Sequence, residues 1–423
     1  MIDLKAFRKN PQPYIQGASD KGFKIDFEQF QALDVKLLQI KQQIEELQNK
    51  KNILSKTFAT IKQGGGQADD IAEQVKTIKQ ELEDLQTQYD EDQVIFDQLY
   101  LLIPNPPLIQ VPYGPSDDHN VEVAVIWQKP DFDFTPATHD QILEQTNMLD
   151  SQRAVKISGS RFVILRNDLV RLEFALVQRA LNKLINKWFS PAIVPTIVNA
   201  DAMYSTGFLP YGGDQIYKLQ ADEEGKELYL VGTAEVPLVA QHSDEILKSD
   251  QIPLRYCGFS SCYRQEAGTY GKDMKWLIRV HQFDKLEMVS FVTAQQSADE
   301  LELIRSIEEE IYTELGIPYR RLLICTWDLW VPAAMKYDLE AWFPWLGIYK
   351  EITSCSNCTD FQTRRAKIRI KTEQGNEYLH SLNGTAIALG RCMAAIAENY
   401  QTAQGQIKVP NCLISYIGKE ILG

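Results

Sequence analysis

Two neighbouring stretches of the chain gather side chains suited to a phosphorylated, nucleotide-like substrate. Arg264 and Glu266 stand in the first stretch, and Arg279, Phe283 and Glu287 stand in the second. Residues two apart on a strand point to the same face of a sheet, so both sets can line one face. Arginine binds phosphate through paired donors, and a flat aromatic ring suits a nucleobase. The pattern indicates an ATP-binding face, although charges on a solvated strand would alternate in the same way. The two stretches are Phe259–Gly268 and Leu277–Met288.

A third candidate lies near the C-terminus, where Leu382–Arg391 leads into a helix of small residues. Arg391, close to a glycine-containing helix start, is a further candidate phosphate ligand. An ordinary buried amphipathic helix explains the same pattern, so both interpretations stay open. The chain contains no G-x-x-x-x-G-K-[ST] loop and no G-x-G-x-x-G after a strand.

Neither a zinc site nor redox chemistry is expected at the cysteines. Cys355 and Cys358 form a C-x-x-C, but a structural zinc site needs a second pair of ligands at comparable spacing, and the other cysteines are scattered. The five histidines show no H-x-x-x-H spacing. We expect His281 to be a sheet or core residue, not a base, and we expect no zinc.

The elements around these residues predict an α+β domain with an antiparallel sheet flanked by helices, because strands and helices do not alternate regularly. Helices are expected at Leu169–Lys187, after Asp168 as N-cap, and at Ser297–Leu315. A strand at Ala192–Val198 contains Pro195 and should therefore lie at an edge or an interface. Further strands are expected at Glu227–Val231, Leu254–Arg264, Leu277–Val289, Tyr319–Cys325, Tyr349–Thr353 and Lys367–Ile370.

An antiparallel two-helix coiled coil is expected near the N-terminus. Apolar residues recur at alternating steps of four and three from Leu33 to Ile61 and again from Ile71 to Ile103, with breaks only at Lys51 and Asp92. Gly64–Gly66 stops the first helix and turns the chain back. Each helix would be about 50 Å long at 1.5 Å per residue, so the pair should project as an arm.

The two arm helices differ in charge. Residues 31–62 hold six lysines against three acids, whereas residues 69–98 hold two lysines against ten acids. A basic helix on a rigid rod suits a phosphate backbone. Charge complementarity within the hairpin explains the asymmetry equally well, and an oligomerisation or spacer hairpin remains an alternative.

Composition sets the broad class of the protein. A chain of 423 residues is too long for one ordinary hydrophobic core, so two domains are expected. Its residues are 44% hydrophobic and 24% charged, as in an average globular protein. The formal net charge of -13 argues against general nucleic-acid affinity. No transmembrane run and no leader peptide is expected, and seven cysteines indicate reduced thiols in the cytoplasm. Prolines predict a stiff linker at 104–120, which separates an N-terminal domain with the helical arm at 1–103 from a larger domain at 121–423.

The whole chain resembles the seryl-tRNA synthetases. Its Leu169–Pro195, Phe259–Glu287 and Gly384–Arg391 stretches are similar to class II motifs 1, 2 and 3. Segments specific to the seryl enzymes strengthen the resemblance, as does the arm. They are Gly232–Leu238, Tyr337–Trp342 and Lys350–Phe361.

The resemblance implies the roles of individual residues. Arg264 would hold the α-phosphate of ATP, Glu266 the adenine amino group, and Arg391 the γ-phosphate, and these three are the catalytic candidates. Phe283 would stack on adenine, and Glu351 with Ser354 would ligate the bridging Mg²⁺. Serine would be bound by Thr233, Ala234, Glu235, Arg279, Glu287 and Thr385. The remaining expected ATP contacts are Gln265, Ile352 and Thr353.

The resemblance also implies the reaction and its partners. Serine and ATP would form seryl-adenylate, and the seryl group would pass to the 3′ end of tRNA(Ser), and of tRNA(Sec) as well. The enzyme would be a cytoplasmic homodimer built on motif 1, with no membrane association. The arm would contact the long variable arm of the tRNA, with Lys50, Lys51 and Lys56 on the RNA-binding face.

Some residues depart from the family pattern. Trp276, Trp327, Trp330 and Pro332 replace smaller residues, and the arm lacks arginine between Gln31 and Ile103. Two alternatives therefore remain: a relative that loads another acceptor, and a non-catalytic scaffold. The arm argues against the first, and the retained Arg and Glu residues argue against the second.

Overall fold

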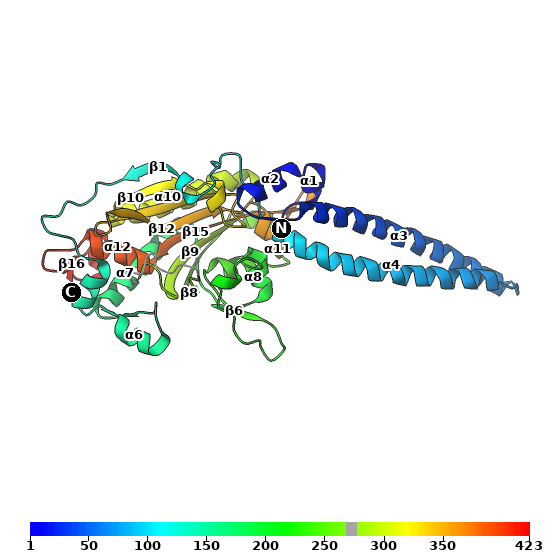
Figure 1. Ribbon diagram of the computed structural model, residues 1–423, viewed down its shortest axis with the longest axis horizontal. Coiled ribbons are helices and arrows are strands. Elements are labelled where there is room, and N and C mark those ends of the chain that lie inside the picture. The colour runs from blue at the N-terminus through cyan, green and yellow to red at the C-terminus, as the bar shows by residue number, and fades with distance from the viewer. Residues whose placement is uncertain (268–276) are drawn as a thin grey trace. The chain divides into compact units, whose positions relative to one another are not determined.

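The structure is a computed structural model that describes residues 1–267 and 277–423. Trp276 and Gly268 lie outside the described residues. The chain forms two compact units, one of residues 23–103 and one of residues 1–22 together with 104–423. Figure 1 shows the helical hairpin of the first unit and the sheet of the second.

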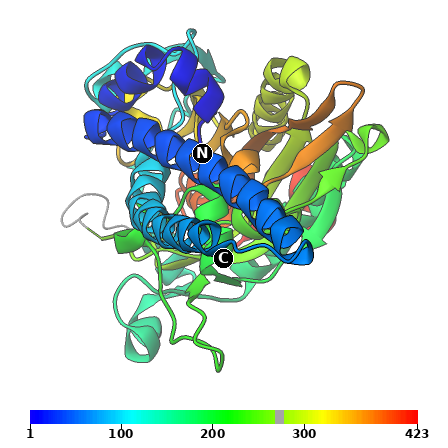
Figure 2. The ribbon, with the colours of Figure 1, turned by 90° about the vertical axis from the view of Figure 1, so that its right-hand side faces the viewer.

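The smaller unit is the antiparallel helical hairpin that the heptad pattern predicted. Helix α3 runs from Phe27 to Gln63 and helix α4 from Asp69 to Leu102, side by side in Figures 1 and 2. Asp26 caps α3 by accepting a hydrogen bond from the Gln29 amide at 2.9 Å. Gly65 in the turn has a φ of +79°, which glycine adopts without strain.

The two interruptions of the heptad pattern have different environments. Asp92 is nearly buried, and its carboxylate lies 2.7 Å from the ammonium group of Lys36 on the facing helix. Lys51 is half-buried at its core position. Close to the open end of the hairpin, the rings of Phe30 and Phe96 stack with centroids 4.8 Å apart. The hairpin is thus joined by apolar packing and by at least one ion pair between its basic and acidic helices.

The larger unit is built on an eight-stranded sheet in the order β1-β10-β11-β12-β15-β9-β8-β4. All neighbours are antiparallel except β4 and β8, so the expected α+β class is confirmed. Its strands are β1 Val121–Ile126, β4 Ser190–Ile193, β8 Leu254–Tyr263, β9 Gln282–Val292, β10 Tyr319–Leu323, β11 Met335–Phe343, β12 Ile348–Asn357 and β15 His380–Ala388.

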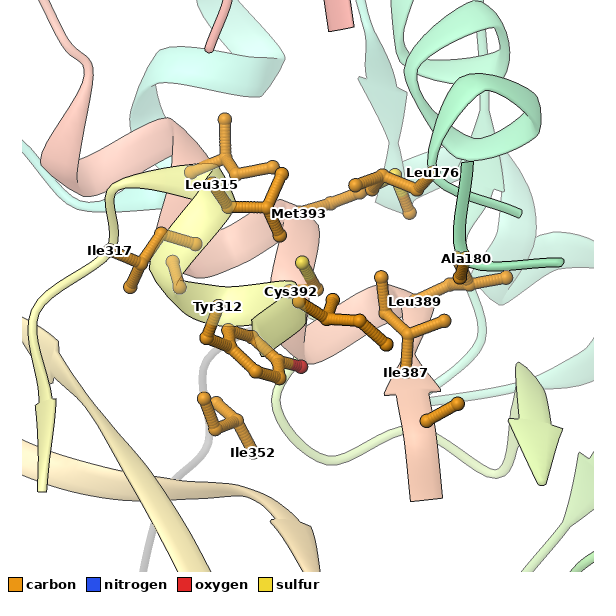
Figure 3. Close-up of a cluster of buried hydrophobic side chains, with 14 of the residues drawn as sticks. Leu176, Ala180, Tyr312, Leu315, Ile317, Ile352, Ile387, Leu389, Cys392 and Met393 are labelled. Atoms are coloured by element: carbon orange, nitrogen blue, oxygen red, sulfur yellow. The ribbon is translucent and has the colours of Figure 1, made fainter. Parts of the chain in front are cut away.

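Three helices cover one face of this sheet: α7 (Asp168–Asn186), α10 (Ser297–Leu315) and α12 (Leu389–Asn399). Their apolar faces meet the sheet in one buried cluster. Figure 3 shows Leu176 of α7, Tyr312 of α10 and Met393 of α12 converging there. The opposite face of the sheet carries the polar residues Lys285 and Glu287 of β9 and, further along the same strand, a second apolar cluster that includes Val289 and Phe291.

The remaining elements are short and surround the sheet. The other helices are α1 Leu4–Lys9, α2 Gln12–Asp20, α5 His139–Gln145, α6 Ser151–Ser158, α8 Ala200–Thr206, α9 Glu235–Ala240, α11 Phe361–Ala366 and α13 Ile414–Ile417. The other strands are β2 Leu149–Asp150, β3 Ile164–Leu165, β5 Ile197–Asn199, β6 Leu228–Leu230, β7 Ile246–Leu247, β13 Arg369–Thr372, β14 Gly375–Tyr378, β16 Ile407–Lys408 and β17 Ile421–Leu422. Within the described ranges, no helix has both the length and the apolar character needed to cross a membrane.

Several predicted elements differ from the structure. The strand expected at 277–289 begins only at Gln282, because Leu277 has a φ of +73° and the backbone amide of His281 bonds to Arg161 instead of a neighbouring strand. The strand expected at 192–198 is two strands in different sheets, β4 and β5. Pro195 lies between them, and β4 does form the edge of the large sheet.

The C-terminal prediction also needs correction. Residues 380–388 are a central strand, and the helix of small residues starts at Leu389. Asp168 is the first residue of α7, preceded by Asn167, instead of its N-cap. The central strand was missed because β15 is covered on both faces and so lacks the alternation that marks a half-exposed strand.

Candidate active site

One cavity of about 460 Å³ brings together nearly all the predicted site residues. Ala234 and Gln265 are the exceptions. Ala234 is fully buried beside α9, and the Gln265 side chain donates to the carbonyl oxygen of Ile216 at 2.8 Å. The predicted residues that line the cavity are Thr233, Glu235, Arg264, Glu266, Arg279, Phe283, Glu287, Glu351, Ile352, Thr353, Ser354, Thr385 and Arg391.

Strand pairing accounts for much of this convergence. Alternate residues of β9 reach the cavity at Phe283, Lys285 and Glu287. On the neighbouring strand β15, Thr385 lies directly opposite Glu287 in the ladder, and its hydroxyl donates to the Glu287 carboxylate at 3.3 Å. Arg264 comes immediately after β8. The shared face was therefore predicted correctly for Phe283 and Glu287, whereas Arg279 reaches the cavity from the irregular segment before β9.

The outer part of the cavity carries three arginines and an aromatic ring. The Arg264 guanidinium lies 5.4 Å from the centre of the Phe283 ring. Arg279 donates to the Glu266 carboxylate at 3.1 Å. Arg391 donates to the backbone carbonyl oxygen of Glu351 at 3.0 Å. This end combines stacking surface with fixed positive charge, which is the chemistry that a nucleoside polyphosphate requires.

A β-bulge positions the oxygen ligands of the candidate metal site. Leu339 pairs with Thr353 and Glu340 with Glu351, so Ile352 is an extra residue in β12. In a regular strand, positions three apart face opposite sides, but the bulge lets both Glu351 and Ser354 line the cavity. The bulge thus re-aims the Glu351 side chain toward the same space as Ser354.

Glu351 is held in its anionic form. Desolvation raises the pKa of its carboxyl group, but the positive charges of Arg391, Lys336 and Arg264 outweigh that effect and lower it to about 2. The carboxylate forms a 3.3 Å ion pair with Arg391, and the side chain is 44% exposed. A permanently ionised and partly accessible carboxylate beside a hydroxyl group suits Mg²⁺.

The inner end of the cavity is a hydrogen-bonded floor around Glu235. One carboxylate oxygen accepts from the Gln362 amide at 2.7 Å and from the Asn383 amide at 2.8 Å. Burial and, after it, the nearby charge of Glu287 raise the pKa of Glu235, the bond from Gln362 and the charge of Lys285 oppose the rise, and the net pKa is about 7. Near neutral pH, a cationic ligand would therefore shift Glu235 toward its ionised form.

Sequence reasoning missed several residues of this floor. Lys285 forms a buried ion pair with Glu287 and contacts the Thr385 hydroxyl at 3.5 Å. Lys285 stands two residues from Glu287 on one strand, so the same alternation rule would have found it. Asn383 stands two residues before Thr385, but β15 had not been recognised as a strand. Gln362 comes from helix α11, which no local pattern connects with the site.

A second unpredicted pair stands beside the bulge. Lys336 lines the cavity, and its ammonium group lies 2.9 Å from the Asp338 carboxylate on the same face of β11. Burial raises the pKa of Asp338 to about 7, and the Lys336 charge opposes this rise. The pair places a further positive charge near Glu351.

The C-x-x-C thiols are both fully buried, and burial raises the pKa of each well above its ordinary value. Cys358 lines the cavity, where its sulfur accepts from the Asn383 amide at 3.6 Å. In the described ranges, no group of three or more His, Cys, Asp or Glu side chains could hold a metal ion.

Two of the bulky departures from the family pattern line the cavity. Trp330 and Pro332 are part of its wall, and the Trp330 ring lies 6.4 Å from that of Phe208. Trp327 occupies the space beside Gly22, where a Cβ atom would lie 2.4 Å from the indole. Gly22 has a φ of +77° and no side chain, so it accommodates this tryptophan.

Comparison with protein-family profiles gives two matches. Residues 1–107 match the seryl-tRNA synthetase N-terminal domain, and residues 217–400 match the tRNA synthetase class II core domain (G, H, P, S and T). The serine–tRNA ligase of Cupriavidus taiwanensis is 41% identical, over 99% of this chain and 98% of its own length. The serine–tRNA ligase of Exiguobacterium sibiricum is 39% identical over the same shares.

Solved structures agree with these matches. The seryl-tRNA synthetase of Pyrococcus horikoshii complexed with ATP superimposes with a TM-score of 0.93 at 33% identity, covering 100% of this chain and 99% of its own. The cytoplasmic serine–tRNA ligase of Naegleria fowleri in complex with AMP gives a TM-score of 0.88 at 26% identity, covering 100% and 98%.

The environment of Glu235 predicts a pH-dependent contribution to stability. Its pKa of about 7 in the folded state exceeds that of an exposed glutamate. At pH values between these two pKa values, the folded state therefore binds more protons than the unfolded state. The free energy of unfolding should therefore fall as pH rises through this window, by up to about 3 kcal/mol for this group. Glu235→Gln keeps the acceptor oxygen and should remove this part of the slope.

The measurement is urea denaturation of the wild type and of Glu235→Gln at pH 5, 6, 7 and 8. The exposed Glu373→Gln serves as the control and should follow the wild type. Parallel pH profiles for the wild type and Glu235→Gln would contradict the raised pKa.

Proposed function

The chain belongs to the seryl-tRNA synthetase family of class II aminoacyl-tRNA synthetases, and on that premise we propose that it forms seryl-adenylate and then seryl-tRNA(Ser). One observation carries the proposal: a single cavity joins a phosphate-binding end to a carboxylate-lined floor. The first end suits ATP, and the second suits the ammonium and hydroxyl groups of serine. We place the reaction in the cytoplasm, as the resemblance implies, and propose tRNA(Sec) as a second acceptor.

ATP would bind at the outer end. The adenine ring would stack on Phe283, and the Glu266 carboxylate or backbone would accept from the adenine amino group. Arg264 would contact the α-phosphate and Arg391 the γ-phosphate. Arg264 lies near the Phe283 ring and Arg391 pairs with Glu351, so both guanidinium groups face the proposed nucleotide space.

The Mg²⁺ that accompanies ATP would be held by the carboxylate of Glu351 and the hydroxyl of Ser354. The residues fit, since Mg²⁺ binds nucleotides through one or two protein oxygen ligands plus the phosphates, and Glu351 remains ionised. The ion would neutralise phosphate charge during the displacement. Lys336 lies near the same space and would add to that neutralisation.

Serine would bind at the floor. Thr233, Glu235 and Glu287 would bind its ammonium and hydroxyl groups, and Thr385 would make a further contact with serine. Arg279, now paired with Glu266, would help to hold the serine carboxylate. We add Asn383 to this set, because its amide already orients the Glu235 carboxylate.

The chemistry follows from this placement. The serine carboxylate attacks the α-phosphorus of ATP, pyrophosphate leaves, and the terminal ribose hydroxyl of the tRNA then attacks the adenylate carbonyl with AMP as leaving group. The protein supplies positioning and charge neutralisation, without a nucleophile of its own. A site that hydrogen-bonds the serine hydroxyl leaves buried polar groups unpaired with alanine, so it should reject alanine strongly.

The direct test measures pyrophosphate exchange with serine, threonine and alanine together with transfer of labelled serine to tRNA(Ser) and tRNA(Sec). We expect serine-selective exchange and charging. Glu287→Gln should lower kcat/KM for serine on the order of 100-fold, because a charged hydrogen bond is lost. The exposed Glu373→Gln should leave it unchanged. Exchange without charging would indicate another acceptor, and failure of both would indicate a scaffold.

The arm would bind the tRNA through the basic helix α3. Lys50 and Lys56 are exposed and Lys51 is half-buried, so two of the three predicted side chains are accessible to a phosphate backbone. The acidic helix α4 would be repelled by RNA. This asymmetry supports α3 as the RNA-facing side of the hairpin.

Replacing Lys50, Lys51 and Lys56 with Gln should raise the KM for tRNA(Ser) about tenfold, because up to three phosphate contacts are lost. Serine-dependent pyrophosphate exchange should remain unchanged. The matched control is Lys76→Gln with Lys79→Gln on α4, which should leave the KM for tRNA close to that of the wild type. Unchanged charging by the triple variant at physiological salt would rule out α3 as the RNA-binding face.

The homodimer would form on the motif 1 elements α7 and β4. Large apolar side chains are exposed along this segment and after it: Phe174 is 66% exposed, Trp188 84%, Ile193 87% and Ile197 50%. Exposed apolar residues at this density are typical of subunit interfaces. They support a second copy of the chain as the partner of this surface.

Trp188→Asp combined with Ile193→Asp should convert a dimer into a monomer, because two charges would be buried without partners. Light scattering coupled to size-exclusion chromatography measures the change. Ile109→Asp is the matched control, since Ile109 is 96% exposed and lies in the proline-rich linker. A wild-type monomer, or a dimer that survives the double substitution, would contradict the proposed interface.

A further inference from the structure

A short segment before strand β11 forms one wall of the cavity. We call residues 330–333 the wall segment, because Trp330, Pro332 and Ala333 line the cavity. Val331 and Ala333 are buried, whereas the Trp330 indole is 41% exposed. The backbone of this segment therefore decides where the Trp330 ring stands relative to Phe208 across the cavity rim.

Lys21 holds the wall segment from one side. It follows helix α2 and is only 4% exposed, and its ammonium group donates to the carbonyl oxygens of Trp330 at 3.1 Å, Val331 at 3.4 Å and Ala333 at 2.7 Å. Burial lowers the pKa of Lys21 to about 7, although the Cys358 thiol opposes this shift. An ammonium group with this geometry fixes three backbone carbonyls at once, so it determines the path of the segment.

Asn105 holds the same segment from the other side. Its amide group donates to the carbonyl oxygens of Pro332 and Cys358, each at 2.8 Å, and its backbone amide donates to Val331 at 3.0 Å. Cys358 in turn accepts from Asn383, which orients Glu235. Asn105 thus links the wall segment to the floor of the cavity.

Both residues lie close in sequence to the helical hairpin. We call the chain segments just before α3 and just after α4 the roots of the hairpin, and each residue lies in one of them. Lys21 comes six residues before α3 begins at Phe27, and Asn105 comes three residues after α4 ends at Leu102. Both lie in the larger compact unit. The chain therefore leaves the larger unit just after Lys21 and returns to it just before Asn105, and both of these residues hold the wall segment.

We propose that Lys21 and Asn105 are positioning residues for the amino-acid end of the cavity, and that they join the two roots of the α3/α4 hairpin to it. RNA bound to the hairpin would then bias the wall through these roots. The inference rests on the proposed function, because it assigns the floor of the cavity to serine. Neither residue touches a reacting atom; each acts through the wall segment.

The first test separates the amino-acid end from the nucleotide end. Lys21→Met keeps the length of the side chain but removes its donors, and it should raise the KM for serine in pyrophosphate exchange about tenfold. The KM for ATP and kcat should stay within about twofold of the wild type. Lys9→Met, on the exposed face of α1, is the matched control.

Asn105→Ala is the second variant, and it should give the same rise in the KM for serine if Lys21→Met is poorly folded by circular dichroism. Equal increases in the KM for serine and for ATP would overturn the proposal, as would an unchanged KM for serine in a folded variant. Absence of serine-dependent exchange in the wild type would instead refute the proposed function.

The second test concerns the hairpin roots and uses tRNA(Ser) whose terminal ribose has been oxidised with periodate, so that it cannot accept serine. Added to the exchange reaction, it should lower the wild-type KM for serine about fivefold. The effect should disappear in Lys21→Met and in Asn105→Ala but persist in Lys9→Met. A wild-type KM that does not respond to this tRNA, or a response retained in both variants, would overturn the link through the roots.

Discussion

A carboxylate that is to attract an ammonium group inside a cavity must first lose its hydration water. This desolvation disfavours the charged form of Glu235 and is the main reason why its pKa is raised to about 7. Two amide donors, Gln362 and Asn383, make the burial tolerable by supplying the hydrogen bonds that water would have given. Nearby, the Lys285–Glu287 ion pair keeps a second carboxylate inside the protein. The remaining architecture serves to hold these groups in place.

The two faces of the sheet have different roles in holding these buried groups in place. Helices α7, α10 and α12 bury one face of the sheet, and the other face carries the site beside a second, smaller apolar cluster. Alternation along β9 and β15 brings Glu287 and Thr385 together, and the bulge at Ile352 re-aims Glu351 toward Ser354. The result is a cavity with anionic groups at the floor and arginines toward the outer end, in the order that an amino acid and a nucleotide require.

The bulky substitutions are accommodated outside this polar set. Trp327 occupies the space beside Gly22, and Trp330 stands at the rim on a backbone held by Lys21 and Asn105. The departures from the family pattern at Trp330 and Pro332 thus lie in the wall of the cavity, while the other lining positions keep the residue types that the resemblance implies.

The sequence by itself determined the features that repeat locally or form contiguous motifs. Heptad spacing predicted the hairpin, and the helix expected at Ser297–Leu315 matches α10 to the residue. The motif residues expected to bind serine or ATP line the cavity with the exceptions of Ala234 and Gln265. Alternation also predicted correctly that Phe283 and Glu287 share a face. These properties depend on neighbours only a few positions away along the chain, so they can be read without the fold.

Only the tertiary structure decided which distant groups meet. Asn383 lies 148 residues from Glu235, and Lys21 lies 312 residues from Ala333, and nothing in the local sequence marks either pair. The start of β9, the buried strand β15 and the bulge in β12 depended on pairing with other strands, because a strand buried on both faces loses its alternation and a bulge is defined only by its partner. Local periodicity thus specified the elements, whereas long-range hydrogen bonds specified the floor and the wall of the site.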